Sequence, residues 1–305
     1  MKLSKRLEMV VSFAGREQKK AGAEEMRSRG EPGTAPRRVA DVGTDHGYVP
    51  IALVLRDPEV RAVAMDVRPG PLERARAHIR EQGLEERIET RLGDGVEKLK
   101  EGEADTVIIA GMGGELVIHI LEGGRRLWDA VGRWILSPQS ELDKVRRYLD
   151  SHGFIITDEA MVEEDGKYYT VMEAARRRRA AEPEKARPEG FAGAGGAEKP
   201  EDVGQGGLAR PDGAPGPEEM LRQAGYLYGP RLIEKKDPVL ARFLEREDGQ
   251  LTEIIERLGS RENPHTAARR EELRRRRSLV RRALDEVTRP GGGGGEGGKR
   301  GEGDI

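Results

Sequence analysis

The sequence predicts an α/β protein whose sheet is largely parallel, followed by a helical hairpin. Three observations support this prediction. Strand-like apolar runs alternate with amphipathic stretches through the first 175 residues. Several of the apolar runs end in clusters of glycine and aspartate. Beyond residue 218, apolar side chains recur at heptad spacing.

Composition limits the class of protein. Of the 305 residues, 35% are hydrophobic and 36% are charged, which is too polar for one compact core along the whole chain. The absence of cysteine excludes disulfides and cysteine-ligated metal sites. No apolar run is long enough to span a membrane and no signal peptide is visible, so we expect a cytoplasmic protein. A net charge of −2 argues against a uniformly basic nucleic-acid binder but allows local basic patches.

The segment 39–50 has the pattern of a buried strand, a tight loop and the first turn of a helix. Three residues separate Gly43 from Gly47, and glycine lets a loop turn sharply and lets the backbone approach a ligand. Asp41 and Asp45 flank the loop, so two carboxylates lie where a ligand would bind. The segment therefore predicts a cofactor loop.

The second expected strand, 60–67, carries an acid at its end. Asp66 lies 66 − 41 = 25 residues after Asp41. In nucleoside-binding α/β folds an acid about 20 residues past the glycine loop accepts the ribose hydroxyls. The alternative is a turn aspartate before the Pro-Gly-Pro sequence that follows. The glycine loop upstream makes the binding role the favoured interpretation.

Two further strand ends carry glycines. Asp94 lies between two glycines, and its carboxylate either receives an adenine amino group or belongs to a plain turn. Residues 111–114 follow a strongly apolar strand and contain three glycines around Met112. So little side-chain bulk at the end of a buried strand favours a backbone that lines a pocket.

The remaining elements complete the sheet. Further strands are expected at 134–136, 154–162 and 167–173, with an acidic turn at 163–166 between the last two. Five strand–helix alternations followed by a hairpin predict a parallel sheet with an antiparallel strand at one edge. Helices cover both faces of such a sheet, and its ligand crevice lies at the carboxyl ends of the strands. The glycine and aspartate clusters all fall at those ends.

The chain divides into four parts in this interpretation. Residues 1–175 form the α/β domain, with a surface loop at 16–36. Residues 176–217 form a disordered linker, 218–289 a helical coiled-coil domain and 290–305 a glycine-rich tail. The coiled-coil domain is expected to be an antiparallel helical hairpin with a break at 259–264. Its seam residues are Leu240, Leu244, Leu251, Ile254, Leu258, Leu273, Val280, Leu284 and Val287.

Two groups of basic residues have two interpretations each. Lys5 and Arg6 lie opposite the apolar face of an N-terminal helix, where they either contact phosphates or are solvated. Between residues 269 and 289 there are nine arginines and four acids, a net charge of 9 − 4 = +5. This charge run is either the solvated face of a coiled coil or a nucleic-acid contact.

Several motifs together give the chain a family resemblance. They are LSKRL at 3–7, DVGTDHGYVP at 41–50, GDG at 93–95, IAGMGG at 109–114 and EEDGKYY at 163–169. With these motifs the sequence resembles the bacterial tRNA (adenine-22-N1)-methyltransferases of the TrmK type over residues 1–174, apart from the 16–36 loop, and again from residue 228. It departs from the pattern at 137–139, where it has SPQ and some members have QPN.

The resemblance implies a fold, a cofactor and a partner. The fold is a Rossmann-like class I methyltransferase sheet with a terminal β-hairpin, followed by the coiled coil. The cofactor is S-adenosylmethionine and the partner is tRNA; no metal and no membrane are expected, and a monomer is compatible with the sequence. The cofactor-binding residues that the resemblance implies are Asp41, Gly43 and Gly47 around the amino-acid portion, Asp66 at the ribose, Asp94 and Gly95 at the adenine, and Gly111, Met112 and Gly113 beside the target base.

The resemblance also implies catalytic and RNA-binding residues. Asp45 is implied as the catalytic acid/base, because a carboxylate near the adenine N6 amino group stabilises the charge that N1 methylation creates. The target base must leave its stack, which requires anchors on the RNA phosphates. The expected anchors are Lys5, Arg6, Arg274, Arg275, Arg277 and Arg281.

Other functions remain open at this stage. A methyltransferase acting on another RNA position or on a small molecule would share the cofactor loop, but a small-molecule enzyme has no use for a basic helical arm. A non-catalytic RNA-binding protein would explain the arginines but not the glycine and aspartate lining. A nicotinamide-dependent oxidoreductase is disfavoured, because Gly43 and Gly47 do not form the G-x-G-x-x-G pattern.

Overall fold

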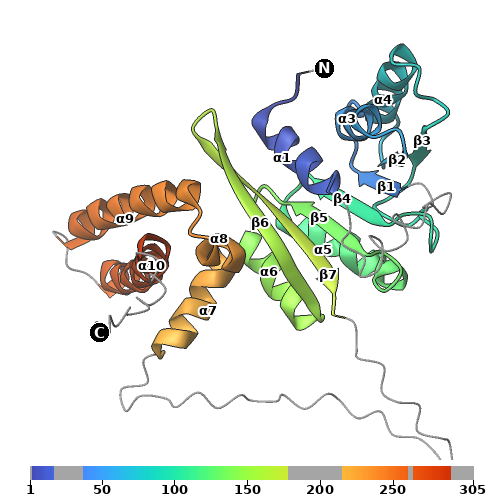
Figure 1. The fold of residues 1–305 in the computed structure, drawn as a ribbon. Helices are drawn as coiled ribbons and strands as arrows, with labels where there is room; N and C mark the ends of the chain where they lie inside the picture. Colours follow the sequence, from blue (N-terminus) through green and yellow to red (C-terminus); the bar gives the residue numbers. More distant parts are fainter. Residues whose placement is uncertain (1, 17–36, 178–214, 260–263, 290–305) are drawn as a thin grey trace, which may run out of the picture.

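The computed structural model describes residues 2–16, 37–177, 215–259 and 264–289 (Figure 1). The predicted surface loop, apart from Arg16, and the predicted tail lie outside these ranges, as does 178–214 of the predicted linker. Within the described ranges, no helix is both long and apolar enough to cross a membrane.

The sheet has seven strands in the order β3-β2-β1-β4-β5-β7-β6. β1 to β5 are parallel, and the order changes direction between β1 and β4. This change is the switch point at which α/β folds bind ligands, outside the carboxyl ends of the strands. The parallel strands are β1 (Arg37–Val42), β2 (Val60–Asp66), β3 (Ile88–Leu92), β4 (Thr106–Ala110) and β5 (Arg133–Ser137).

Helices cover both faces of the sheet, as predicted. Side chains along β4 point alternately to the two faces of the sheet. Ile108 packs in the hydrophobic core on one face, and Val107 and Ile109 pack in the core on the opposite face. The first core includes residues of α1 (Lys5–Ala14), α3 (Tyr48–Arg56) and α4 (Pro69–Glu81). The second includes residues of α5 (Gly114–Gly123), η1 (Arg125–Leu127) and α6 (Leu142–Ser151).

The predicted alternation of strands and helices fails at one place. Among the described residues, turns rather than a helix connect β3 to β4. The predicted count of five strand–helix alternations is therefore wrong by one. The physical reason lies in the glycines of this connection, because Gly95 and Gly102 have left-handed φ values of 49° and 71° that interrupt any helix.

The terminal hairpin is present and longer than predicted. β6 (Phe154–Glu164) and β7 (Lys167–Arg176) pair in antiparallel fashion, and β7 also pairs antiparallel to β5. Only Asp165 and Gly166 form the turn, with φ values of 50° and 72°. An Asp-Gly pair supplies the two left-handed residues of a tight hairpin turn, so the neighbouring acids extend β6 instead of belonging to the turn.

The C-terminal helices form a lobe beside the edge strand β6 (Figure 1). α9 (Pro238–Gly259) and α10 (Pro264–Thr288) are antiparallel, because Lys236 Nζ donates to Arg289 O at one end while Arg276 pairs with Glu247 further along. We call α9 and α10 the helical arm. Two shorter helices precede the arm and connect it to the α/β domain: α7 (Pro217–Tyr228) and α8 (Pro230–Glu234).

One predicted seam residue of the arm is wrong. Ile254 is 39% exposed, and Ile255 packs into the core of the lobe instead. At about 100° per residue, Ile254 lies about 60° from Leu251 around the helix and Ile255 about 40° from it on the other side, so an exact seven-residue repeat selects the wrong one of the two neighbours. The other predicted seam residues are buried or packed against this core: Leu240, Leu244, Leu251, Leu258, Leu273, Val280, Leu284 and Val287.

Candidate functional site

Two glycine loops meet at the switch point of the sheet. Gly43 follows β1 with a left-handed φ of 78°, and its N–H donates to Met65 O at 2.8 Å. A Cβ atom added at Gly43 would lie 1.9 Å from Met112 Cε, in the loop that follows β4. Met112 Cε is the end of a flexible side chain, so the stronger requirement for glycine here is the φ of 78°, which residues with a Cβ atom rarely adopt. The structure thus brings together two of the segments that the sequence singles out.

Two buried carboxylates lie below these loops. Asp41 at the end of β1 and Asp66 at the end of β2 are each 6% exposed. Burial raises the pKa of Asp41 to about 6; the Thr44 hydroxyl opposes the shift slightly and the Asp66 carboxylate adds to it. A carboxyl group that is buried although burial disfavours its charged form is typical of a binding site rather than of a structural turn.

Both interpretations of Asp66 have a counterpart in the structure. Its Oδ1 accepts a hydrogen bond from Arg68 N at 2.8 Å, which closes the turn before α4. Its Oδ2 has no hydrogen-bond partner among the described residues. One carboxylate can therefore hold the turn and still offer an acceptor at the edge of the sheet.

The loop after β5 supports the loop after β4. Gln139 N donates to Met112 O at 2.8 Å, and Gly111 N donates to Ser137 O at 3.1 Å. Residues 137–139, where the sequence departs from its family pattern, therefore serve the site through their backbone. Gly113 and Gly114 are tightly packed against the following residues, because Cβ atoms there would lie 3.2 Å from Ser140 Oγ and 2.7 Å from Ser140 O.

The loop after β3 contributes an exposed carboxylate. Asp94 is exposed and its backbone carbonyl accepts from Glu97 N at 3.0 Å. Gly95 has a φ of 49°, and a Cβ atom there would lie 3.1 Å from Ile120 in α5. The glycine is thus required for packing as well as for the turn, and the structure places Asp94 at the carboxyl edge of the sheet with the other candidates.

Asp45 lies at the outer side of the loop. Its side chain is 58% exposed, and Oδ1 pairs with Arg74 Nη2 at 2.9 Å and lies 3.5 Å from His46 Nε2. The aromatic ring of His46 stacks on Tyr48 and His78. Gly47 follows His46 and has a φ of 71°, and a Cβ atom added there would lie 3.3 Å from Ala75 Cβ in α4. The loop thus holds the Asp45 carboxylate at the surface, beside a cation.

The candidate phosphate anchors on α1 contact the hairpin. Lys5 N donates to Glu164 Oε1 at 2.6 Å and Lys5 Nζ donates to Glu163 O at 3.3 Å. The guanidinium of Arg6 lies 5.4 Å from the centre of the Tyr169 ring. These contacts give Lys5 and Arg6 a role in attaching α1 to the hairpin, whatever else they bind.

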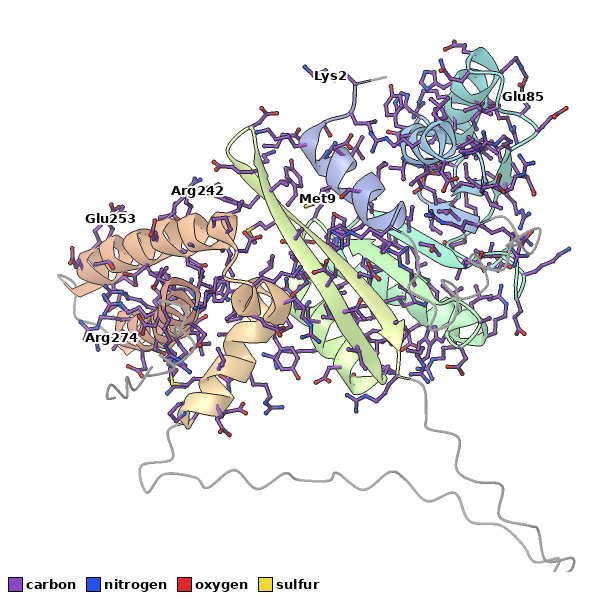
Figure 2. The ribbon with its side chains drawn as sticks, in the orientation of Figure 1. Lys2, Met9, Glu85, Arg242, Glu253 and Arg274 are labelled. Atoms are coloured by element: carbon purple, nitrogen blue, oxygen red, sulfur yellow. The ribbon has the colours of Figure 1, made fainter. Side chains whose placement is uncertain are left out.

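The arginines of α10 divide into two sets. Arg277 and Arg281 both pair with Asp248 of α9, at 2.8 and 3.2 Å, so they hold the arm together. Arg275 pairs with Glu271 on its own helix at 3.4 Å. Arg274 is exposed, has no ion-pair partner among the described residues and projects outward from the arm (Figure 2). Of the four, Arg274 is the best placed to meet a phosphate.

A cavity of about 750 Å³ lies away from the glycine loops. Its walls come from α6, β6, α7 and α8, and none of the predicted site residues lines it. Among the described residues there is also no cluster of acids and histidines that could hold a metal ion. The candidate site is therefore the shallow edge at the switch point and not this cavity.

Comparison with known proteins gives a consistent result. Residues 33–172 match the family described as "Methyltransferase domain". The chain is 40% identical over 136 residues to a Bacillus subtilis (strain 168) protein named tRNA (adenine(22)-N(1))-methyltransferase. That match covers 45% of this chain and 57% of the relative, so the chain matches little more than half of the relative's length.

Solved structures extend the similarity to almost the whole chain. The B. subtilis m1A22 tRNA methyltransferase TrmK is 29% identical, with a TM-score of 0.65, covering 93% of this chain and 99% of that one. The chain therefore resembles the TrmK-type methyltransferases in sequence over part of its length and in fold over most of it. A Streptococcus pneumoniae protein described as a putative tRNA (m1A22) methyltransferase, solved in complex with S-adenosyl-L-methionine, is 26% identical, with a TM-score of 0.63 over 93% of this chain and 100% of that one.

The switch-point residues of this chain fit such a cofactor. Asp41 is a buried acid in a site that offers no cation to it among the described residues, and the Thr44 hydroxyl is buried without a hydrogen bond of normal geometry. Left-handed glycines keep the backbone of both loops free of side chains. Asp66 offers an acceptor one strand away, as in other nucleoside-binding sheets.

Sequence reasoning missed two buried ionic residues. Arg146 and Glu159 are 1% and 0% exposed at their side chains and pair with each other at 2.9 Å. The spacing of Leu142, Val145 and Leu149 indicates the inner face of α6, and Arg146 lies on that face. A charged residue at an apolar position of the helical pattern was the signal that could have revealed it.

Proposed function

We propose that this protein transfers the methyl group of S-adenosylmethionine to N1 of adenine 22 in tRNA. The observation that carries the proposal is the contact between the Gly43 loop and Met112 at the switch point, above the buried Asp41. It occurs in a chain that is 40% identical over 136 residues to a tRNA (adenine(22)-N(1))-methyltransferase.

The cofactor residues act by position and charge. When bound, S-adenosylmethionine supplies a methyl group that its sulfonium already makes electrophilic, so the protein needs no covalent intermediate. Asp41, Gly43 and Gly47 would hold the amino-acid portion, Asp66 the ribose, and Asp94 with Gly95 the adenine. Gly111, Met112 and Gly113 would border the space for the target base.

Asp45 is the proposed catalytic residue. Methylation at N1 makes the adenine cationic, and a carboxylate at its N6 amino group accepts a hydrogen bond and takes up the proton that restores neutrality. The 58% exposure of Asp45 supports this role, because a base that leaves its stack in the RNA must reach it from outside. Its pair with Arg74 is a surface contact that water and substrate readily replace.

The helical arm is the proposed second contact with tRNA. Arg274 contributes a free cation to phosphates, and Lys5 and Arg6 contribute at the other end of the site. A substrate of this size also accounts for a basic arm that a small-molecule enzyme would not need. We place the reaction in the cytoplasm, where tRNA is available to the protein.

Transfer of labelled methyl groups separates this proposal from its alternatives. The full-length protein is incubated with labelled S-adenosylmethionine and with total tRNA, ribosomal RNA or a small-molecule extract. We expect label in tRNA alone, recovered as 1-methyladenosine after digestion. Label in the extract alone would refute the RNA substrate, and binding of S-adenosylhomocysteine without transfer to any acceptor would refute the enzymatic function.

A further inference from the structure

A buried ion pair connects the α/β domain to the C-terminal helices. Arg146 Nε in α6 donates to Glu159 Oε1 in β6 at 2.9 Å, and both side chains are almost fully buried. Such a pair is costly because both charges leave water, so its other atoms need hydrogen bonds of their own. Those bonds go to α7 and α8. Among the described residues, Arg146 Nη2 alone of the pair's polar atoms is buried without a partner.

Arg146 satisfies the end of α7. The carbonyls of the last helical turn have no partners within the helix. Tyr226 O cannot receive the usual bond from the residue four positions later, because that residue is Pro230 and has no N–H. Arg146 Nη1 donates to Tyr226 O at 2.9 Å and to Leu227 O at 3.1 Å instead. The guanidinium thus caps the negative end of the helix.

Glu159 satisfies the start of α8. Arg231 N would be the helical partner of Leu227 O, but it donates to Glu159 Oε2 at 3.0 Å. Gly229 lies between the two helices with a left-handed φ of 103°. A Cβ atom there would lie 2.8 and 3.0 Å from the two carboxylate oxygens of Glu159. The pair and the glycine therefore fix one geometry for the α7–α8 junction.

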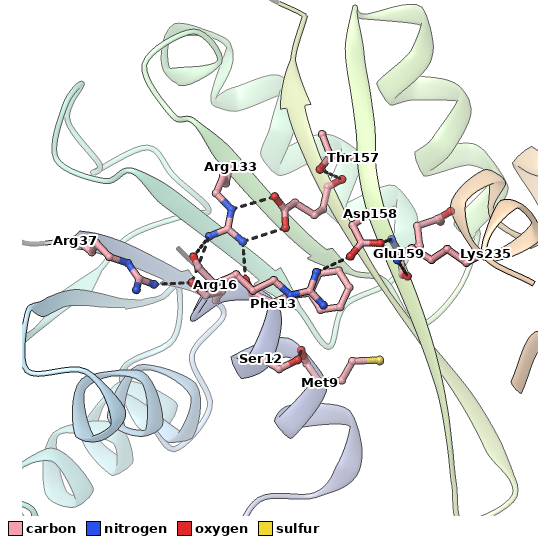
Figure 3. Close-up of polar contacts among 12 residues, drawn as sticks. Met9, Ser12, Phe13, Arg16, Arg37, Arg133, Thr157, Asp158, Glu159 and Lys235 are labelled. Carbon is pink, nitrogen blue, oxygen red and sulfur yellow. Dashed lines mark hydrogen bonds and ion pairs between the residues drawn. The ribbon is translucent and has the colours of Figure 1, made fainter. Parts of the chain in front are cut away.

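The neighbouring residue of β6 adds a second connection. Asp158 follows a register shift in the β6–β7 pairing. Its carboxylate accepts from Arg16 Nη1 at 2.5 Å and also pairs with Lys235, which follows α8 (Figure 3). The register shift thus places two consecutive acids, Asp158 and Glu159, where both reach α8 or the residue after it.

The same pair is close to the methyltransferase site along the chain. α6 begins at Leu142, directly after the loop whose Gln139 N bonds to Met112 O. Arg146 is four residues further, about one helical turn. At the other end, α10 packs on both α7 and α8. A continuous series of contacts therefore runs from the Met112 loop through Arg146 to the helical arm.

We propose that Arg146 and Glu159 are positioning residues for the RNA substrate: their pair holds the α7–α8 junction and so sets the angle between the helical arm and the methyl-transfer site. The inference rests on the proposed function, because it gives the arm an RNA to present. An RNA that spans both parts binds well only when the arm stands at one angle.

The test replaces both charges together. The double variant Arg146→Met/Glu159→Met leaves no unpaired buried charge, so it is expected to fold. Because the wild-type chain has no cysteine, spin labels attach at Glu85→Cys and Glu253→Cys, two exposed positions at opposite ends of the molecule (Figure 2). We expect a narrow label-to-label distance distribution with the wild-type pair, a broad or displaced one in the double variant, a KM for tRNA raised at least tenfold, and unchanged affinity for S-adenosylhomocysteine.

A second variant tests the junction without touching the charges. Gly229→Ala forces a Cβ atom against the Glu159 carboxylate at a strained φ, so we expect the same rise in KM and the same change in distance. Gly249→Ala is its control, since a Cβ atom at this position of α9 meets nothing within 4 Å. The control for the double variant is Arg133→Met/Glu173→Met, which removes another buried ion pair that holds the end of α1 and not the arm.

The outcomes separate this inference from the proposed function. If the wild-type protein methylates tRNA and both test variants keep its KM and its distance distribution, the positioning role is wrong while the function stands. If Arg133→Met/Glu173→Met raises the KM as much as Arg146→Met/Glu159→Met, the effect is general loss of stability and the inference also fails. If the wild-type protein methylates no tRNA, the proposed function itself fails.

Discussion

Replacing Asp41 by asparagine tests whether the buried acid is held for binding at the expense of stability. Burial raises the pKa of Asp41 from 3.8 to about 6 in the folded protein. Between these two values the folded protein keeps a proton that the unfolded chain has lost, so the free energy of unfolding falls as the pH rises through this window. Asparagine has no charge to bury and removes this dependence.

The magnitude follows from the size of the shift. A difference of about 2.2 pH units corresponds to about 3 kcal/mol at about 1.4 kcal/mol per unit, of which about 2 kcal/mol develops between pH 4.5 and pH 7.5. The free energy of unfolding of Asp41→Asn minus that of the wild type should therefore rise by about 2 kcal/mol over this interval. The same variant should bind S-adenosylhomocysteine at least tenfold more weakly, because the acceptor charge is gone.

Urea denaturation of both proteins at the two pH values measures this difference, and titration calorimetry measures the affinity. Asp94→Asn is the matched control for the stability measurement, because it removes an exposed carboxylate from the same edge of the sheet. A stability difference for Asp41→Asn that stays constant with pH would refute the account of the buried acid.

Three further predictions concern the loops and the arm. Asp45→Ala should retain affinity for S-adenosylhomocysteine and lose about 100-fold or more in kcat, as expected when a general acid/base is removed. Arg74→Ala breaks the same ion pair and should keep most of its turnover. Equal losses of the two variants in single-turnover assays would assign Asp45 a structural role. Gly43→Ala should weaken S-adenosylhomocysteine binding at least tenfold, because its Cβ atom would collide with Met112. Gly83→Ala is the control, because Gly83 also has a left-handed backbone but open space around it. Similar affinities of the two variants would count against the loop contact. Arg274→Ala should raise the KM for tRNA several-fold and lower the slope of log KM against log salt concentration by about 1. Replacing the exposed Arg242 of α9 by alanine should change neither quantity. Equal slopes for the Arg274→Ala and Arg242→Ala variants would remove Arg274 from the RNA contact.

The sequence predicted the part of the site that depends on local chain geometry. Glycines and aspartates at the ends of apolar runs indicated four strand ends, and parallel pairing brings those ends to one edge. The structure confirms the sheet, its helical layers and the terminal hairpin. Asp41 and Asp66 are both buried near the carboxyl ends of the neighbouring strands β1 and β2.

Features that depend on distant partners were not predictable. A charged residue at an apolar position of α6 marks Arg146 as unusual, but the sequence does not show that its partners are carbonyls 80 and 81 residues away. The use of Arg277 and Arg281 within the arm required knowing that Asp248 faces them. Ile254 was misplaced because an exact heptad count selects residue 254, whereas the turn of the helix brings Ile255 closer to the line of Leu251.

In the proposed function, the switch-point loops and the arm act together to methylate one particular adenine of tRNA. Labelled methyl transfer to two transcripts of the same tRNA, with adenine or guanine at position 22, measures this selectivity. We expect one methyl group per adenine-22 transcript, located at N1, and background incorporation into the guanine-22 transcript. Equal incorporation into both transcripts would refute methylation at adenine 22.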